Sequence, residues 1–474
     1  MILRSKVLVS VLAAAAAVAA CQSSDGEPVT GGAGAPAAGA GAGTAGAGHA
    51  AGSKGDAGAA PVGDAGAGGE PSGHAGSGGH AAHAGDGNSG GATAGADNGG
   101  NAGGSEAGSG GEAGTENGGS SGEGGTPDGP SVVAYVGTIL GGVFACSVDP
   151  VSGAPTKLGD AIAKNSFVAA LAVDSQQHFL YVAQEQKHLD VYRIAADGSL
   201  PAQPDSTIAT PDTLNTLTLD PLGRFAYAGS VAGRAIYGYT IDADSGALSS
   251  MGEPIVVGNE TQGGANYLVA DPTGHFLYVS NAFGGGITGF TIAPTTGALT
   301  VIPGSPFGAV GLPGGHNVFG GAIAIKPSGD FLYSVGGALN AFAIAADGKL
   351  DLVAGSPFTL DVQSDPDASN LAIDPQGAYL YTTHFLGNNH IHGFKIDPGN
   401  GSLAAVPSSP ITGTAPYSVA VDPSGRFLYV GVDDANGLDA YTIQRSTGAP
   451  TRVDGSLFAI GGLEPAIAFA KLGQ

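Results

Sequence analysis

The chain has 474 residues, a formal net charge of −24 and 86 glycines, and it contains no tryptophan. Because it is acidic and has no basic stripe that would follow a phosphate backbone, nucleic acid and an anionic membrane surface are excluded as expected partners. Glycine is concentrated in residues 21–130, which hold 39 of the 86. Composition alone therefore separates a leading region from a remainder that is able to form a core.

Residues 1–20 have the pattern of a secretory signal peptide. Arg4 and Lys6 precede an uncharged apolar run that is too short to span a bilayer comfortably. Residues 18–21, Val-Ala-Ala-Cys, resemble a bacterial lipobox, which predicts palmitate-type acylation of Cys21 and anchoring to the lipid bilayer without a membrane span. The alternative is ordinary cleavage that leaves Cys21 unmodified. Gln22 stands where lipoproteins retained at the inner membrane carry Asp, which points to the outer membrane or the cell surface.

Residues 21–130 are predicted to form a disordered tether. They consist mainly of Gly, Ala and Ser, with twelve acids against the single base Lys54. Such a segment buries too little apolar surface to offset the loss of chain entropy on folding. A flexible chain of this length has a root-mean-square span on the order of 60 Å, which would lift a domain clear of the membrane surface.

Residues 131–474 contain a repeat of an apolar strand, an Asp-Pro-x-Gly turn and a strand ending in Leu-Tyr. In the turn, Asp accepts backbone N–H bonds, Pro presets its own φ, and Gly supplies the left-handed exit. After the Leu-Tyr strand, each unit continues with an aromatic strand and a second turn that opens a fourth strand. Four antiparallel strands per unit form a propeller blade. The copies span residues 171–181, 217–227, 269–278, 323–333, 371–381 and 419–429.

A seventh blade is split between the two ends of the repeat region. Residues 132–135 match the second strand of a blade, and residues 465–469 supply the missing first strand. The sequence therefore predicts an all-β fold, a seven-bladed β-propeller closed by its N- and C-terminal strands, which leaves no open sheet edge.

The Asp-Pro-x-Gly-x-Phe-Leu-Tyr-Val pattern resembles the lactonase-type seven-bladed propellers, a group that includes 6-phosphogluconolactonase-like and cycloisomerase-like proteins and is related to the YVTN surface repeats. The resemblance covers residues 131–474. It implies the fold, and for an active member it implies hydrolysis of a carboxylic ester ring. Members of this family carry ionisable groups in their middle blades, and those groups have no counterparts in residues 264–267, 280–284, 320–323 and 335–338.

The two faces of the predicted propeller differ in what they carry. The Asp-Pro-x-Gly turns and the second turns of the blades share one face, here called the turn face. The remaining loops share the other, here called the loop face, and loops on a rigid scaffold are where binding residues concentrate. Candidate ligand-binding residues on the loop face are Lys187, Arg234, Asn266, Asn281 and Asp433.

Histidines of the loop face are the candidates for catalysis. Opening a lactone requires a base that activates water, and the candidate imidazoles are those of His316, His384, His390 and His392. His390 and His392 lie two apart on a strand and point to the same side, so a base or a metal pair is one interpretation. Solvated loop histidines are the alternative, and neither a metal nor another cofactor is predicted.

The favoured interpretation is a surface-displayed, lactonase-like propeller that acts as a binding or interaction module for a small molecule or a protein. The alternative is an active lactonase or cycloisomerase-like enzyme with a histidine-based site. An extracellular address does not fit a cytosolic sugar-phosphate pathway, and the loop face is poor in the cations that a phosphorylated sugar requires.

Overall fold

The structure is a computed structural model. It describes residues 131–164, 166–258, 263–282, 286–308, 321–336, 338–358, 360, 368–384, 389–433 and 436–473. The predicted signal peptide, the predicted lipidation site Cys21 and the predicted tether lie outside the described residues. Within those residues every regular element is a β-strand, and no helix is long and apolar enough to cross a membrane.

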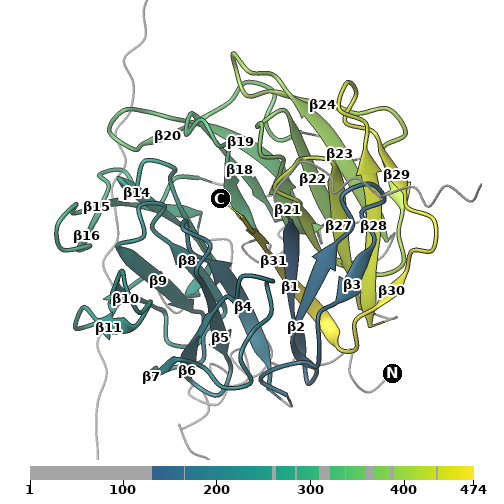
Figure 1. The fold of residues 1–474 in the computed structure, drawn as a ribbon. Helices are drawn as coiled ribbons and strands as arrows, with labels where there is room; N and C mark the ends of the chain where they lie inside the picture. Colours follow the sequence, from purple (N-terminus) through teal and green to yellow (C-terminus); the bar gives the residue numbers. More distant parts are fainter. Residues whose placement is uncertain are drawn as a thin grey trace, which may run out of the picture. The chain divides into compact units, whose positions relative to one another are not determined.

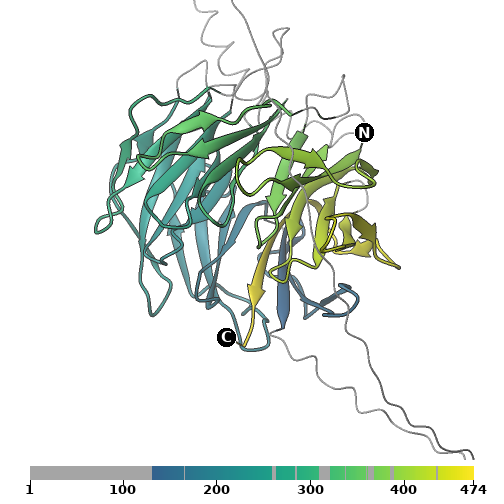
Figure 2. The same ribbon diagram turned by 90° about the horizontal axis from the view of Figure 1, so that it is seen from above.

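The strands form seven antiparallel sheets arranged as the blades of a propeller (Figures 1 and 2). The inner strands are β4 (Val168–Val173), β8 (Thr216–Leu219), β13 (Ala265–Ala270), β17 (Ile323–Ile325), β21 (Ala368–Ile373), β26 (Pro416–Val421) and β31 (Leu463–Lys471). Each inner strand packs against the inner strands of the two neighbouring blades, which closes the ring. The seven-bladed fold predicted from the sequence is confirmed.

The remaining strands follow outward in each blade. The second strands are β1 (Val132–Ile139), β5 (Phe179–Gln184), β9 (Phe225–Ser230), β14 (Phe276–Asn281), β18 (Phe331–Val335), β22 (Tyr379–His384) and β27 (Phe427–Val432). The third strands are β2 (Gly142–Val148), β6 (His188–Arg193), β10 (Ala235–Ile241), β15 (Ile287–Ile292), β19 (Leu339–Ile344), β23 (His390–Ile396) and β28 (Gly437–Ile443). The outer strands are β3 (Pro155–Lys157), β7 (Ser206–Ala209), β11 (Leu248–Ser250), β16 (Leu299–Val301), β20 (Leu350–Leu352), β24 (Leu403–Ala405) and β29 (Pro450–Arg452). Three blades carry a short fifth strand, β12 (Ile255–Val256), β25 (Ile411–Thr412) or β30 (Phe458–Ala459).

The closing blade joins the two ends of the repeat region. Strand β31 pairs antiparallel with β1, and the register places Val136 opposite Ile467 and Ala134 opposite Phe469. Figure 1 shows these two strands, from opposite ends of the colour scale, side by side. The predicted closure by terminal strands is therefore correct, and it pairs the edge that a linear array of blades would leave open.

The Asp-Pro-x-Gly turns hold each inner strand to the second strand of its blade. In the β13–β16 blade the buried Asp271 carboxylate accepts the backbone N–H groups of His275 and Phe276, at 2.7 and 2.6 Å. The β17–β20 blade exchanges the charges, because Lys326 takes the first turn position and its ammonium group pairs with Asp330 at 3.1 Å. In both arrangements, the charged side chain at the first turn position therefore has polar partners within its own turn.

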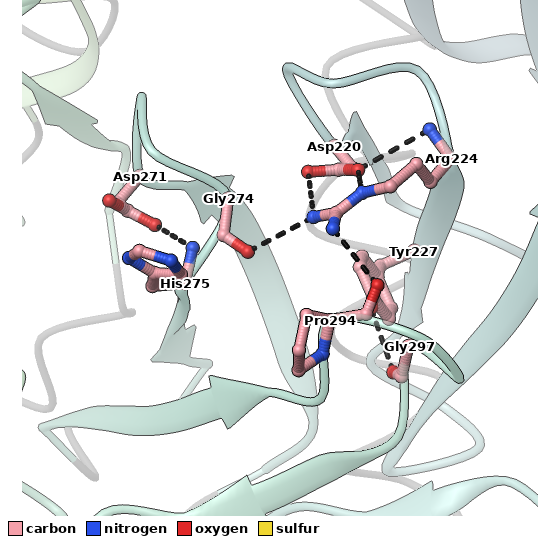
Figure 3. A network of polar contacts seen from close by, with 8 residues as sticks. All are labelled: Asp220, Arg224, Tyr227, Asp271, Gly274, His275, Pro294 and Gly297. Carbon is pink, nitrogen blue, oxygen red and sulfur yellow. Dashed lines mark hydrogen bonds and ion pairs between the residues drawn. The ribbon is translucent and has the colours of Figure 1, made fainter.

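Arg224 shows how the turns also join neighbouring blades (Figure 3). Its guanidinium Nε donates to the Asp220 carboxylate at 2.6 Å within its own turn. The other guanidinium nitrogens reach the next blade, where they donate to the carbonyls of Pro294 at 3.0 Å and Gly274 at 3.3 Å. The turn face is therefore occupied by contacts that hold the blades together.

A ring of seven tyrosine–glycine hydrogen bonds links each blade to the next. Each tyrosine lies in a second strand, is fully buried, and donates its hydroxyl proton to a glycine carbonyl in the second turn of the following blade. The pairs are Tyr135–Gly198, Tyr181–Gly246, Tyr227–Gly297, Tyr278–Gly348, Tyr333–Gly401, Tyr381–Gly448 and Tyr429–Gly153, with distances of 2.6 to 3.0 Å. The seventh pair connects the last complete blade to the closing blade.

Removing one hydroxyl from this ring is expected to destabilise the protein. In Tyr381→Phe the buried Gly448 carbonyl loses its donor, which costs about 1–3 kcal/mol because the group stays desolvated. Urea unfolding would measure this loss. The control is Tyr239→Phe, which deletes a hydroxyl from another buried ring that is not part of the tyrosine–glycine ring. Equal losses in the two variants would contradict a special contribution from the ring.

Candidate functional site

The five predicted ligand-binding residues lie on the loop face but in four different blades. Lys187 and Arg234 occupy hairpin tips between second and third strands, with positive φ angles of 63° and 51°. Asn266 and Asn281 belong to the β13–β16 blade, and Asp433 follows β27. The Lys187 ammonium group donates to the Pro211 carbonyl at 2.8 Å. The five candidates are therefore contributed by four different blades rather than by one.

Three of the four predicted catalytic histidines do come together, and His316 lies outside the described residues. His384 ends β22, while His390 and His392 lie in the paired strand β23. The ring centroids of His384 and His392 are 4.7 Å apart, and those of His390 and His392 are 5.8 Å apart. His392 also stacks on Phe394, with centroids 6.2 Å apart.

Burial makes two of these three histidines, His384 and His392, poor sources of base catalysis, whereas His390 is half-buried. His384 is fully buried and His392 is 3% exposed. Burial lowers the pKa of His384 from 6.5 to about 4, and repulsion from His390 adds to the effect. The His384 ring is therefore neutral at physiological pH. Within the described part of the chain, no three His, Cys, Asp or Glu side chains are arranged to hold a metal ion.

A different group of polar side chains lies where the inner strands begin at the loop face. We call this region the inner rim, defined by residues 265–267 of β13, 368–370 of β21 and 416–418 of β26. In each of these strands the pairing register shifts by one residue at the same place, as between Ala265 and Tyr267. Such bulges re-aim side chains and are frequent beside functional sites.

Tyr267 connects two strands of the inner rim that are not neighbours. Its hydroxyl donates to the Asn370 side-chain oxygen at 3.4 Å, although β17 lies between their strands. Strand β17 has only three residues, whereas β13 and β21 have six. Tyr267 packs against apolar residues of the β17–β20 blade and of the blades on both sides of it.

Asn370 continues this network toward the next blade. Its side-chain amide donates to the Tyr417 carbonyl at 3.0 Å, and the Thr383 hydroxyl donates to the same carbonyl at 3.2 Å. Burial raises the pKa of Tyr267 to about 12, so its phenol is neutral and serves as a hydrogen-bond donor. Asn266, Tyr267, Asn370 and Tyr417 are all half-buried. The inner rim thus presents aromatic and amide groups without a formal charge on these four residues.

Sequence reasoning placed Asn266 among the candidates but missed Tyr267, Asn370 and Tyr417. Each of the three lies directly before or within the first apolar strand of a repeat, one or two residues upstream of the aligned motif. This position just upstream of the repeat motif was the sequence signal that could have identified the three residues. The contact between Tyr267 and Asn370 was not accessible from the sequence, because the two residues are 103 positions apart and β17 lies between their strands.

Comparison with known proteins places the chain in a family. The model of the family described as "Lactonase, 7-bladed beta-propeller" matches residues 132–362 and 323–461. This chain therefore belongs to the lactonase family of seven-bladed β-propellers, as the resemblance of its repeats implied.

Individual relatives are more distant. A 6-phosphogluconolactonase of Pectobacterium carotovorum is 22% identical over 300 residues, which cover 61% of this chain and 82% of the relative. A 6-phosphogluconolactonase of Formosa agariphila is 28% identical over 142 residues, so this chain spans only 40% of that relative's length. The periplasmic gluconolactonase of Pseudomonas aeruginosa superposes with a TM-score of 0.61 at 19% identity, covering 72% of this chain and 100% of that one. At this identity the superposition shows the shared fold.

The histidine cluster predicts a specific loss of stability in acid. His384 has a pKa near 4 in the folded state and near 6.5 in the unfolded state. Protonation therefore favours the unfolded state, and the neutral ring contributes its full stability only above pH 6.5. This contribution is lost as the pH falls from 6.5 toward 4, by about 2 kcal/mol at pH 5. Urea unfolding of His384→Gln and of the parent across pH 5 to 7.5 measures it.

The two stability profiles should converge as the pH falls, because only the parent loses this contribution. The control is His275→Gln, whose ring is exposed on the turn face. A constant difference between His384→Gln and the parent from pH 7.5 to 5 would contradict the buried neutral state.

Proposed function

We propose that this propeller is a binding module for an uncharged sugar or sugar lactone, which it takes at the inner rim. The observation that carries the proposal is the Tyr267–Asn370–Tyr417 network. An aromatic ring beside amide groups suits a sugar, whose C–H faces pack on rings and whose hydroxyls both donate and accept hydrogen bonds. The name of the Pseudomonas aeruginosa relative refers to a lactone of this uncharged kind.

The charges near the inner rim favour an uncharged ligand over a phosphorylated one. Phosphate recognition usually requires converging Arg or Lys side chains. On the loop face Lys187 and Arg234 belong to different blades, and Lys187 is held by the Pro211 carbonyl. A sugar phosphate would therefore meet amides and phenols at the inner rim rather than a cationic clamp.

Hydrolysis is the second candidate function, and membership of the lactonase family favours it. Ring opening at the inner rim requires a base within hydrogen-bond reach of the attacking water. The phenol of Tyr267 has a pKa near 12, and His384 is buried with a pKa near 4. The described groups are better suited to holding a sugar than to removing a proton from water, so we favour binding.

We further propose that the binding module is displayed at the outer membrane or the cell surface, anchored through acylated Cys21. Two features support this: the lipobox pattern of residues 18–21, and Gln22 in place of the Asp of retained lipoproteins. The long acidic segment after Cys21 would give the propeller reach toward ligands outside the cell. A protein in that position meets unphosphorylated sugars.

The binding proposal predicts measurable affinity for glucono-1,5-lactam, a stable and uncharged mimic of a sugar lactone. In Asn370→Ala, loss of about one hydrogen bond should raise the Kd by up to tenfold, and Tyr267→Ala should raise it further because the ring surface is also lost. Isothermal titration calorimetry of the full-length protein measures these changes. The control is Asn400→Ala, an exposed amide in a turn of the turn face.

Two outcomes would contradict the binding module. One is lactam affinity that the inner-rim variants leave unchanged. The other is turnover of glucono-1,5-lactone above the spontaneous rate that Asn370→Ala and Tyr267→Ala both abolish, which would establish hydrolysis at the inner rim instead.

The anchoring proposal predicts that Cys21 carries the lipid. Cells fed radiolabelled palmitate should label the parent protein, and Cys21→Ser should be unlabelled and released from the membrane fraction. Label retained in Cys21→Ser would overturn the anchor. Cys146→Ser is the control, because this second cysteine is buried in the propeller.

A further inference from the structure

A pocket of about 820 Å³ lies between the closing blade and the β4–β7 blade, away from the inner rim. Its apolar wall comes from both blades and includes Val143, Ala145, Leu158, Ile162, Leu200 and Pro204. Its polar wall includes Gln184, His188, Asp190, Tyr192 and Thr207 of the β4–β7 blade. The connection before β4 adds Asp160 and Lys164, which pair with each other at 3.2 Å. We call this space the wedge pocket.

The wedge pocket exists because one outer strand is displaced. In the other six blades the outer strand pairs with the turn-face half of the third strand, as β11 does with Tyr239–Ile241. Strand β7 instead pairs with the loop-face half of β6, where Thr207 lies opposite Asp190. Residues 199–204 therefore contribute no strand and border the pocket. The Asp205 carboxylate accepts the Arg193 N–H at 2.8 Å beside the vacated edge.

The polar wall is organised around one buried carboxylate. Asp190 is 4% exposed and accepts hydrogen bonds from Gln184 and, at 2.7 Å, from the Thr207 hydroxyl. His188 Nδ1 lies 3.1 Å from Asp190 Oδ1. When Nδ1 carries the proton and donates it to the carboxylate, Nε2 becomes the acceptor. The His188 side chain is 28% exposed and lines the pocket, so this nitrogen is accessible from it.

The repeat provides an internal comparison for this carboxylate. Asp439 occupies the equivalent position in β28 and, like Asp190, is followed two residues later by a tyrosine that donates to it. Arg452 neutralises Asp439, with a guanidinium nitrogen 2.6 Å from the carboxylate. Asp190 has an imidazole in place of that permanent cation. In the β4–β7 blade, the carboxylate of Asp190 therefore partners the imidazole of His188, which lines the wedge pocket.

We propose that the wedge pocket is a second site, in which His188 acts as a general base and hydrolyses an uncharged ester with an apolar acyl chain. The apolar wall would hold the acyl chain, and Asp190 is a positioning residue that fixes the imidazole tautomer. His188 Nε2 takes a proton from water while the water oxygen bonds to the ester carbonyl carbon. The bond from that carbon to the alkoxy oxygen then breaks, and His188 returns the proton to the leaving alkoxide. The net products are one carboxylic acid and one alcohol.

The probe for this site is p-nitrophenyl butyrate, with the full-length protein. The parent should release p-nitrophenol faster than buffer or the heat-denatured protein, and His188→Gln should lower the turnover by about 100-fold, the lower end of what a general base contributes. Asp190→Asn should also lower it, because an amide favours the wrong imidazole tautomer. Asp439→Asn at the equivalent repeat position, and His178→Gln on the turn face, are the controls that keep activity.

Chemical rescue by added imidazole distinguishes a catalytic role of His188 from a structural one. In His188→Ala, added imidazole should restore turnover in proportion to its concentration, whereas the same imidazole should not restore Asp190→Asn. Turnover in the parent no faster than in buffer, turnover unchanged in His188→Gln, or an unrescued His188→Ala with parent-like circular dichroism would each overturn the proposal. Asn370→Ala should keep ester turnover, so this site and the inner rim can fail independently.

Discussion

Each hydrogen bond of the tyrosine–glycine ring imposes three requirements on the two residues that form it. The tyrosine must be buried to reach the next blade, and the glycine must adopt a positive φ, as Gly448 does at 73°. The same glycine must also lack a side chain, because a Cβ on Gly448 would collide with the ring of Tyr379 in the preceding blade. Each hydrogen bond contributes only about 0.5–1.5 kcal/mol net, but leaving its buried carbonyl unpaired costs more. Seven repetitions around a closed ring therefore fix the spacing of the blades.

The tyrosine–glycine ring and the Asp-Pro-x-Gly turns occupy the turn face, and the blades differ from one another elsewhere. The loop face carries hairpins of different composition, and the inner rim carries bulges that aim polar groups. The β4–β7 blade varies further by moving its outer strand, which opens the wedge pocket without disturbing Tyr135–Gly198 or Tyr181–Gly246. The wedge pocket thus lies at a departure from the repeat, whereas the contacts that join the blades belong to the repeat.

This division explains what the sequence could predict. Turn chemistry and alternation are local, so the repeat unit and the family resemblance followed from residues within about ten positions of each other. The split seventh blade followed from partial copies of that unit at the two ends of the repeat region. The histidines at 384, 390 and 392 were recognised as a group, but their burial depends on the packing of the neighbouring blade. Tyr267 and Asn370 are 103 positions apart, and the three-residue strand β17 lies between their strands. The role of Asp190 required knowing that β7 pairs with the loop-face half of β6.

The ligand proposed for the inner rim of this closed propeller is an uncharged sugar. Hydrogen–deuterium exchange of the full-length protein, with and without saturating glucono-1,5-lactam, tests this claim most directly because it locates the ligand without substitutions. The account predicts added protection at the starts of β13, β21 and β26, and unchanged exchange at the Asp-Pro-x-Gly turns. Unchanged exchange at all three strand starts, or protection confined to β6 and β7, would contradict it.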